Sequence, residues 1–329
     1  MNDFISAPVS LLDQEYKLGA TPDIRSVVDD LARTEDARFT SDGRRLAIAG
    51  FARGSIMILE LSAPPELAVI GTLSLQHDRI QEPHGLDWIG TDTLAAANRS
   101  GRVEILSVPP AAAGQRSQRA EICTTIRKIG FRRPIHTPGS LAVTPDGAGH
   151  GLWVCNNYAN LISYHRLRKT WRGLRATGNR IALESKIRVP DGITISDDGR
   201  FMGISNHDKH QVLIYRILRP GKAERIGQLE RIDYPHGLRF LPGGTEMIVA
   251  DAGQPFLHVF RTENDWQGDH LPVRQVRVMD DATYLRGRHN PQEGGIKGID
   301  IDVNRGLVAT TCEMQTLKFY RLADVMGNA

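Results

Sequence analysis

The chain has 329 residues, of which 40% are hydrophobic and 24% are charged. This composition supplies a hydrophobic core and excludes an intrinsically disordered chain. The apolar runs are only a few residues long, far below the roughly 20 that a membrane-spanning helix needs. Residues 1–16 lack a basic stretch followed by an apolar one, so we expect no signal peptide.

Lys and Arg total 41 and Asp and Glu total 38, which gives a net charge of +3. The basic residues form no long run and no nucleic-acid-binding motif, so we expect no nucleic-acid partner. Because the apolar runs are too short to span a bilayer, we also expect no membrane partner. Cys123, Cys155 and Cys312 are odd in number and widely spaced. This pattern argues against a disulfide framework and indicates a reducing compartment, so we expect a cytoplasmic protein.

One phrase recurs along the whole chain. Residues 35–50 and 191–206 align without a gap, and both contain an Asp-Gly-Arg turn followed by an apolar strand. Shorter versions of the phrase give six copies in all, roughly 50 residues apart. The copies begin at Glu35, His84, Gly139, Asp191, His236 and Lys297.

Every copy has the same internal order. A short alternating segment comes first, then a turn with Asp-Gly or Gly-Gly, a second strand, a polar loop and a β-branched third strand. A fourth strand is predicted in five copies, at residues 67–75, 120–129, 180–189, 223–232 and 273–279. The sixth copy lacks one, and residues 24–31, ahead of the first copy, are the segment left to complete it.

Four-stranded units repeated at this period are typical of propeller blades. We therefore predict an all-β fold, a six-bladed β-propeller of four-stranded antiparallel blades, closed by an N-terminal strand at residues 24–31. Residues 1–329 would form a single domain. A helical solenoid is excluded because the apolar spacing is two and turn residues interrupt every short segment.

A functional site is expected where the blades meet. The residue before each innermost strand stands at one rim of the central channel, so positions far apart in sequence come together there. Blades 1 and 4 face each other, as do blades 2 and 5. Glu35 then lies opposite Asp191, and His84 lies opposite His236. Two carboxylates and two imidazoles predict a divalent-cation site, which suits zinc, manganese or iron better than calcium.

A second ring of polar side chains is expected to flank this rim and to bind substrate. Its members end the second strands, and they are Asn98, Asn156, Asn157, Asn206, His207, Asp251 and Glu313. Lys297 completes the rim between Glu35 and His236, either as an anchor for an anionic group or as a salt-bridge partner of Glu35. The longest insertion, residues 280–295, is either a lid on the channel mouth or a surface excursion.

At these positions the chain resembles the six-bladed propellers of the SMP-30/gluconolactonase superfamily, which includes NHL-like and calcium-dependent phosphotriesterase propellers. The resemblance covers about residues 24–322 and implies a cation at the channel mouth and hydrolysis of sugar lactones. Glu35 matches a metal-binding Glu of those enzymes, and Asp191 falls on an oxygen-ligand position. Gly139 and His236 depart from the pattern, standing where Asn and Asp ligands are found.

A second resemblance concerns histidine. The Pro-His-Gly-Leu phrases at residues 83–86 and 235–238 are similar to zinc-binding positions of the amidating-lyase propellers. Those sites use three histidines, and the phrase supplies two here.

The sequence therefore favours a metal-assisted hydrolase, similar to a lactonase, that acts on a small polar substrate. The cofactor would be a divalent cation, zinc, manganese or calcium, held by Glu35, His84, Asp191 and His236. Asp191, His236 and Lys297 would act on the substrate, and Asn156 or Asn206 would orient it. Two alternatives stay open: a non-enzymatic propeller that binds a ligand or a protein partner, and a zinc-dependent lyase.

Overall fold

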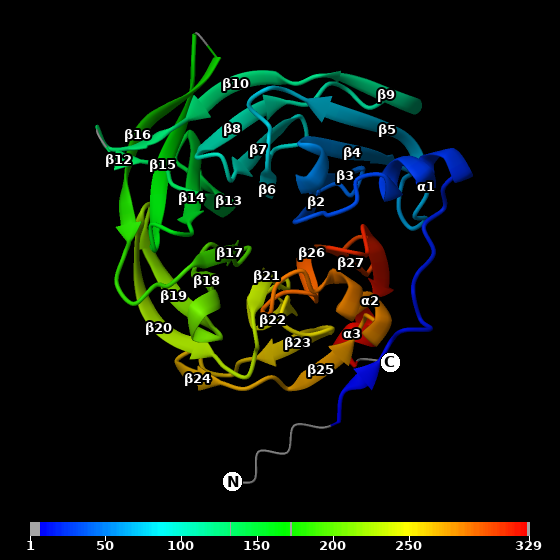
Figure 1. The fold of residues 1–329 in the computed structure, drawn as a ribbon. Coiled ribbons are helices and arrows are strands. Elements are labelled where there is room, and N and C mark those ends of the chain that lie inside the picture. The colour runs from blue at the N-terminus through cyan, green and yellow to red at the C-terminus, as the bar shows by residue number, and fades with distance from the viewer. Residues whose placement is uncertain (1–6, 132, 172, 328–329) are drawn as a thin grey trace.

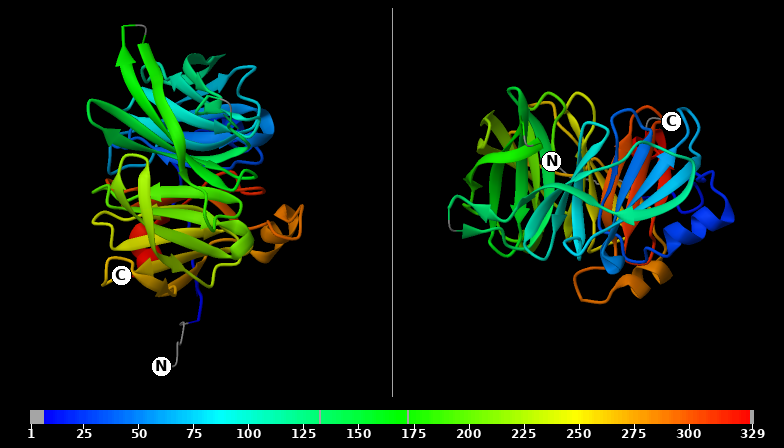
Figure 2. Two further views of the ribbon diagram at one scale, coloured as in Figure 1. Left: turned by 90° about the vertical axis from the view of Figure 1, so that its left-hand side faces the viewer. Right: turned by 90° about the horizontal axis from the view of Figure 1, so that it is seen from above.

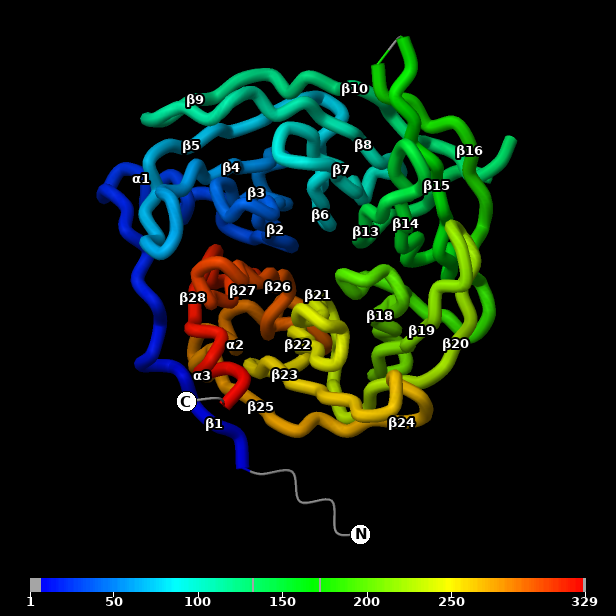
Figure 3. The backbone as a smooth tube through the Cα atoms, turned by 180° about the vertical axis from the view of Figure 1, so that it is seen from behind, coloured from blue at the N-terminus to red at the C-terminus, as the bar shows by residue number. Residues whose placement is uncertain are grey.

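Six small β-sheets stand around one central axis in chain order (Figure 1). The structure is a computed structural model and describes residues 7–131, 133–171 and 173–327. Each of the six sequence copies forms one sheet, and the predicted six-bladed propeller is confirmed. In every blade, neighbouring strands of the copy are antiparallel, and the first strand of the copy is innermost (Figure 3).

The first three blades follow the predicted four-strand order. Blade 1 contains β2 (Ala37–Phe39), β3 (Arg45–Gly50), β4 (Ser55–Leu61) and β5 (Val69–Gln76). Blade 2 contains β6 (Pro83–Ile89), β7 (Thr93–Asn98), β8 (Arg102–Ser107) and β10 (Glu121–Ile126). Blade 3 contains β13 (Pro138–Asp146), β14 (Gly149–Asn156), β15 (Leu161–Thr170) and β16 (Gly173–Leu183).

Blades 4 and 5 also follow the predicted four-strand order, whereas blade 6 has three strands. Blade 4 contains β17 (Pro190–Ile195), β18 (Phe201–Asn206), β19 (Gln211–Arg219) and β20 (Lys222–Leu229). Blade 5 contains β21 (Pro235–Phe240), β22 (Glu246–Asp251), β23 (Phe256–Arg261) and β25 (Arg274–Arg277). Blade 6 has three strands, β26 (Ile296–Asp302), β27 (Leu307–Cys312) and β28 (Lys318–Arg321).

Three blades gain an outer fifth strand in parallel. β9 (Gly114–Arg119) joins β5, β24 (Gly268–His270) joins β20, and β1 (Val9–Ser10) joins β25. The first two come from the following copy, so these strands tie blade 1 to blade 2 and blade 4 to blade 5. They also cover sheet edges that would otherwise expose unpaired backbone groups.

The remaining elements are short. They are the two-stranded sheet of β11 (Lys128–Ile129) and β12 (Arg133–Pro134), the helices α1 (Pro22–Asp29), α2 (Asp281–Gly287) and α3 (Leu322–Met326), and the 3-10 turns Phe51–Arg53 and His207–Lys209. Within the described ranges, no helix has the length and apolar character needed to cross a membrane.

The hydrophobic core lies between blades. Among the described residues, buried side chains form six clusters, and each cluster joins two successive blades; Leu86 of blade 2, for example, packs with Ile58 of blade 1. This distribution follows from the period-two pattern, because both faces of an inner strand are covered by neighbouring sheets. The blades therefore hold each other in a fixed order around the axis.

The predicted closing strand is wrong. Residues 24–31 form no strand, and Pro22–Asp29 is helix α1 instead. Thr21 caps this helix through its side chain, and Pro22 stands at its first turn, where a missing N–H costs nothing. Ile24 and Val28 are four residues apart, so they share one helix face, and they fill the core between blades 6 and 1.

Polar contacts at the inner strands join blade 6 to blade 1. Oδ2 of Asp300 accepts a 2.7 Å hydrogen bond from the backbone N–H of Phe39. Oδ1 of the same carboxylate accepts from Arg239 of blade 5 at 2.8 Å and from Arg38 of blade 1 at 3.2 Å. One buried carboxylate therefore links three blades where the last blade meets the first.

Candidate functional site

Five of the six rim positions lie at irregular strand starts. The pairing register shifts at the beginning of the innermost strand in blades 2 to 6, at the step that holds His84, Gly139, Asp191, His236 or Lys297. A bulge of this kind turns a side chain away from the sheet face that regular pairing would give it. Here it directs the side chains to the axis.

Glycine follows the rim residue in four of these strands because the blades approach closely there. A Cβ atom on Gly192 would lie 1.8 Å from the carbonyl oxygen of His236 in the next blade. In the Pro-His-Gly and Pro-Asp-Gly phrases, Pro begins the strand, His or Asp supplies the rim side chain, and Gly allows the next blade to approach closely.

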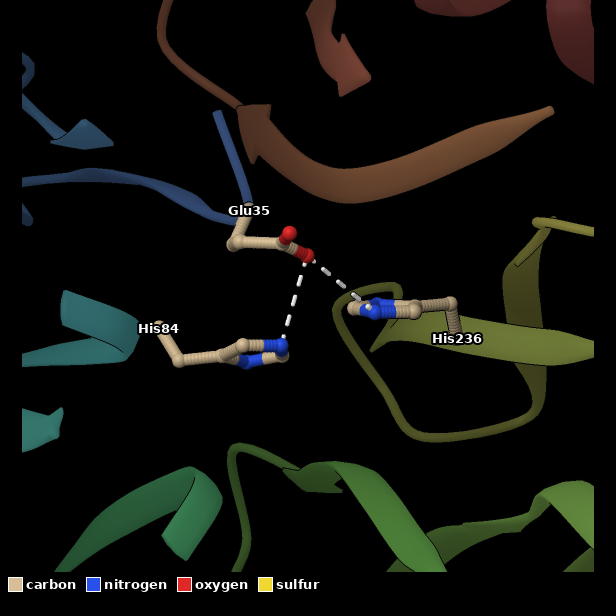
Figure 4. A group of neighbouring side chains, drawn as sticks. All are labelled: Glu35, His84 and His236. Carbon is tan, nitrogen blue, oxygen red and sulfur yellow. Dashed lines mark ion pairs between the residues drawn. The ribbon is translucent and has the colours of Figure 1, made fainter. Parts of the chain in front are cut away.

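The structure brings together Glu35, His84, Asp191 and His236, as the sequence repeat predicted. Oε2 of Glu35 lies 3.3 Å from Nε2 of His84 and 3.5 Å from Nε2 of His236 (Figure 4). Nε2 of His236 lies 3.1 Å from Oδ2 of Asp191. The rings of His84 and His236 are stacked with centroids 5.4 Å apart. All four side chains are buried.

The hydrogen bonds of His84 define its tautomer. Its Nδ1 lies 2.8 Å from the carbonyl oxygen of Gly139 and therefore carries the proton. Nε2 then presents a lone pair, which accepts a 3.0 Å hydrogen bond from Arg99. Oε2 of Glu35 is buried and has no hydrogen-bond partner in the described chain. Two lone pairs thus face each other, an arrangement that suits a cation between them.

A second group shares His236 and contains His207, which the sequence placed in the outer ring and not among the metal ligands. Nε2 of His207 lies 3.7 Å from Oδ2 of Asp191 and has no hydrogen-bond partner in the described residues. Asp191, His207 and His236 can hold a metal ion, as can Glu35, His84 and His236. His207 follows the second strand of its blade, and the repeat placed it beside the rim but not among the candidate metal ligands.

Gly139 leaves room for the carboxylate of Asp191. A Cβ atom at residue 139 would lie 1.8 Å from Oδ1 of Asp191 and 2.3 Å from Oδ1 of Asn157. Nδ2 of Asn157 donates to Oδ1 of Asp191 at 3.0 Å. The amide of Asn157 therefore occupies the space that a side chain at residue 139 would need.

Lys297 lies in a cluster of carboxylates at the same rim. Its Nζ is 3.0 Å from Oε1 of Glu35, 3.0 Å from Oε2 of Glu293 and 3.2 Å from Oε2 of Glu313. Arg33 also contacts Glu35 and lies 3.2 Å from Glu313. Glu293 comes from the insertion 280–295, which forms helix α2 and brings a carboxylate to the rim.

Arg99 is a cation that the sequence analysis did not identify. One of its terminal nitrogens lies 3.0 Å from Nε2 of His84 and 3.3 Å from Oδ2 of Asp191. Its side chain is 20% exposed, whereas those of His84 and Asp191 are buried. Arg99 thus reaches from solvent to the atoms that a metal ion would contact. It follows Asn98 directly, but an Arg at a strand end carries no sequence signal of its own.

The protonation states follow from burial and from these charges. Burial alone would raise the pKa of Glu35, but Lys297 and Arg33 outweigh it and hold the pKa well below its ordinary value. Burial would also raise the pKa of Asp191, but nearby positive charge, including that of Arg99, outweighs burial and lowers this pKa. Burial lowers the pKa of His84 to about 3 and that of His207 to about 4. Both carboxylates are therefore ionised and both imidazoles neutral near pH 7.

His236 behaves differently from the other two histidines. Burial lowers its pKa, but the charge of Asp191 and the hydrogen bond to it reverse the shift, and the pKa is raised. Burial likewise opposes protonation of Lys297, while Glu35 and Glu293 favour it, so its pKa is raised and it stays charged.

Four members of the predicted second ring have another role. The side-chain oxygens of Asn98, Asn156, Asn206 and Asp251 accept hydrogen bonds from the backbone N–H of Glu82, His136, Arg188 and Asp233, respectively. All four side chains are fully buried. Each one anchors the loop that leads into an innermost strand, so the expected substrate contact is replaced by a positioning role. Glu313, the corresponding residue of blade 6, is the exception.

Solved structures share this fold. A functionally unknown protein from Desulfotomaculum acetoxidans is 15% identical, with a TM-score of 0.58 over 88% of this chain and 83% of its own. A protein named provisionally as a gluconolactonase is 14% identical, with a TM-score of 0.56 over 88% of both chains. A protein from Lactobacillus plantarum is 15% identical, with a TM-score of 0.54 over 77% and 70%.

At these identities the likeness concerns the fold, and it confirms the propeller that the sequence resemblance implied. No family model and no curated protein matches the chain.

Proposed function

We propose that the chain is a metal-dependent hydrolase, similar to a lactonase, that acts on a small polar substrate at the channel mouth. One observation carries the proposal: the unpartnered Oε2 of Glu35 faces the lone pair of His84 Nε2 at 3.3 Å, with His236 Nε2 3.5 Å away. Carboxylate and imidazole donors fit zinc, manganese or iron. Calcium fits less well, because it prefers oxygen ligands alone.

Glu35, His84 and His236 would hold the cation. When bound, such an ion polarises a carbonyl group and makes a water molecule more acidic. The carbonyl oxygen of Gly139 accepts a hydrogen bond from Nδ1–H of His84, which keeps the ring in the orientation that aims Nε2 at the centre. Arg99 must withdraw from His84 when the ion enters, and its partly exposed side chain has solvent into which it can move.

Asp191 and His207 would prepare the attacking water. Asp191 is ionised and is held by Asn157, so its Oδ2 can accept a hydrogen bond from water and orient it. The neutral His207 has an unpartnered Nε2 that can accept the proton that the water releases. Lys297 and Arg33 would stabilise negative charge that develops on the substrate.

Metal analysis of the purified protein tests the proposal. We expect zinc or manganese to bind at about one ion per chain or more, to raise the melting temperature and to support hydrolysis across a panel of lactones and simple esters. Absence of bound metal, together with a melting temperature unchanged by zinc, manganese or calcium, contradicts it. Glu35→Gln should weaken metal binding, and Glu263→Gln, at an exposed position, is the matched control.

A ligand-binding propeller without enzymatic activity is the second candidate, and the position of Lys297 favours it. Lys297 contacts three carboxylates and compensates their charge without any ion. The double substitution Glu35→Gln and Lys297→Met separates the two candidates. Loss of metal binding and turnover together supports the hydrolase. If the unmodified protein shows no turnover and the double variant still binds ligand, the result supports the binding protein.

A further inference from the structure

Positive charge is concentrated in one part of the chain. Residues 127–188 contain twelve Lys and Arg but only two Asp and Glu, although the whole chain has a net charge of +3. The rest of the protein is therefore net negative. This stretch forms the edge between blades 2 and 3 and the whole of blade 3.

Two hairpins of this stretch carry an exposed aromatic residue at the tip. Thr170 pairs with Gly173, so Trp171 lies in the two-residue turn between β15 and β16, and it is 87% exposed. Ile129 pairs with Arg133, so Phe131 lies in the turn between β11 and β12, and it is 98% exposed. Large aromatic side chains with this much exposed surface at two hairpin turns are unusual for a surface that binds no partner.

The turn of the β11–β12 hairpin is joined to the middle of strand β16. Nδ2 of Asn179, on β16, donates to the carbonyl oxygen of Lys128, on β11, at 3.0 Å, and Oδ1 of Asn179 accepts from Gly130. β15 and β16 project beyond the rest of the ring (Figures 1 and 2). The pair therefore forms a convex feature on the rim, away from the axial site.

Cations surround both tips. Asp146 is buried and is paired with Arg166 and Arg168 on β15, and Glu184 lies 3.8 Å from Arg133, so these two carboxylates compensate part of the positive charge. The surface nearer the tips, which we call the blade 3 rim, consists of Lys128, Phe131, Arg133, Lys169, Trp171 and Arg175.

We propose that the blade 3 rim binds an anionic phospholipid surface. Aromatic side chains, Trp above all, are favoured at the boundary between headgroups and acyl chains, and Lys and Arg beside them attract acidic headgroups. Sequence analysis led us to expect no membrane partner because no segment is long enough to span a bilayer. Peripheral contact needs only the apolar tips and the surrounding charge.

The shape favours a bilayer over nucleic acid. Single strands are typically bound in a basic groove that follows the phosphate backbone, with bases stacked along it. The two tips are convex and belong to separate hairpins, an arrangement that matches a flat surface better than a single strand.

Tryptophan fluorescence provides a direct test. Trp88, Trp153 and Trp266 are buried, so Trp171 is the exposed tryptophan that a membrane can reach. We expect vesicles of phosphatidylcholine with phosphatidylserine to shift the emission to shorter wavelength, and brominated lipids to quench it. Vesicles of phosphatidylcholine alone should have much less effect, and high salt should weaken the response.

Substitutions locate the contact. Lys128→Gln and Lys169→Gln should each weaken binding about fivefold in vesicle sedimentation, whereas Lys222→Gln, on β20, should not. Phe131→Ala and Trp171→Ala should also weaken sedimentation, with exposed Leu285→Ala on α2 as the control. All six positions lie on the surface, so folding should not be affected.

Three results would overturn the proposal. They are an emission spectrum that acidic vesicles leave unchanged, sedimentation that is insensitive to both lysine substitutions, and binding to single-stranded or duplex oligonucleotides at physiological salt without binding to vesicles.

Discussion

Nε2 of His84 and Oε2 of Glu35 lie 3.3 Å apart in the channel, and neither atom has a proton to offer the other. The proton of His84 is on Nδ1, committed to the carbonyl of Gly139, and Glu35 is ionised. Two buried lone pairs at this separation are unfavourable unless a cation compensates them. In the structure that cation is Arg99, which donates to His84.

Removing Arg99 should therefore strengthen metal binding. In Arg99→Ala, we expect zinc affinity to rise about tenfold, since the ion no longer displaces a guanidinium from His84 and Asp191. Arg99→Lys keeps a charge and should change the affinity less. Titration calorimetry measures both, and an unchanged or weaker affinity in Arg99→Ala would show that Arg99 does not compete with the ion.

Gly139→Ala tests the packing of the site. The added methyl group would collide with Oδ1 of Asp191 and with Asn157. We expect a loss of about 1–3 kcal/mol in the free energy of unfolding and weaker metal binding, because Asp191 must shift. Gly178→Ala on β16 is the control, since its Cβ would meet no atom within 4 Å. Equal effects of the two substitutions on metal binding would contradict this account.

Asp300→Asn tests the closure of the ring. The substitution removes the charge that compensates Arg38 and Arg239, both buried. Breaking a buried ion pair from one side costs about 3–5 kcal/mol, which urea unfolding would detect. Asp265→Asn removes a half-exposed ion pair with Arg200 and should cost well under 1 kcal/mol. Similar losses for both variants would show that the axial network does not close the propeller.

His165 should make stability depend on pH. Burial lowers its pKa to about 4 from an ordinary 6.5, and its Nδ1 has no hydrogen-bond partner within the described chain. Between these two values the unfolded chain binds a proton that the folded protein does not, so stability falls as pH falls. The contribution is up to about 1.4 kcal/mol per pH unit.

His165→Gln should remove this part of the dependence between pH 6.5 and 4, whereas His210→Gln, at an exposed position, should leave it unchanged. Urea unfolding at several pH values measures the difference. A dependence that is identical in wild type and His165→Gln would refute the assignment.

The sequence repeat correctly predicted the blades and the rim positions, but not the way in which the ring of blades is closed. Period-two strands and Asp-Gly turns are local signals, and the rim positions His84, Asp191 and His236 follow from them once six copies surround one axis. Residues 24–31 were misassigned because their apolar residues suit a strand as well as a helix. The Thr21 cap and Pro22 favour the helix, which then packs between two blades.

The sequence by itself determined the blades, their number and the four residues at the axis, because these depend on patterns that repeat in each copy. The tertiary structure alone decided the places of Arg99 and Arg33, the contact of His207 with Asp191 and the anchoring role of Asn98 and its counterparts. Those side chains meet partners from other blades or loops, and no local pattern records a contact between distant segments. Charges and hydrogen bonds across the channel are properties of the closed ring.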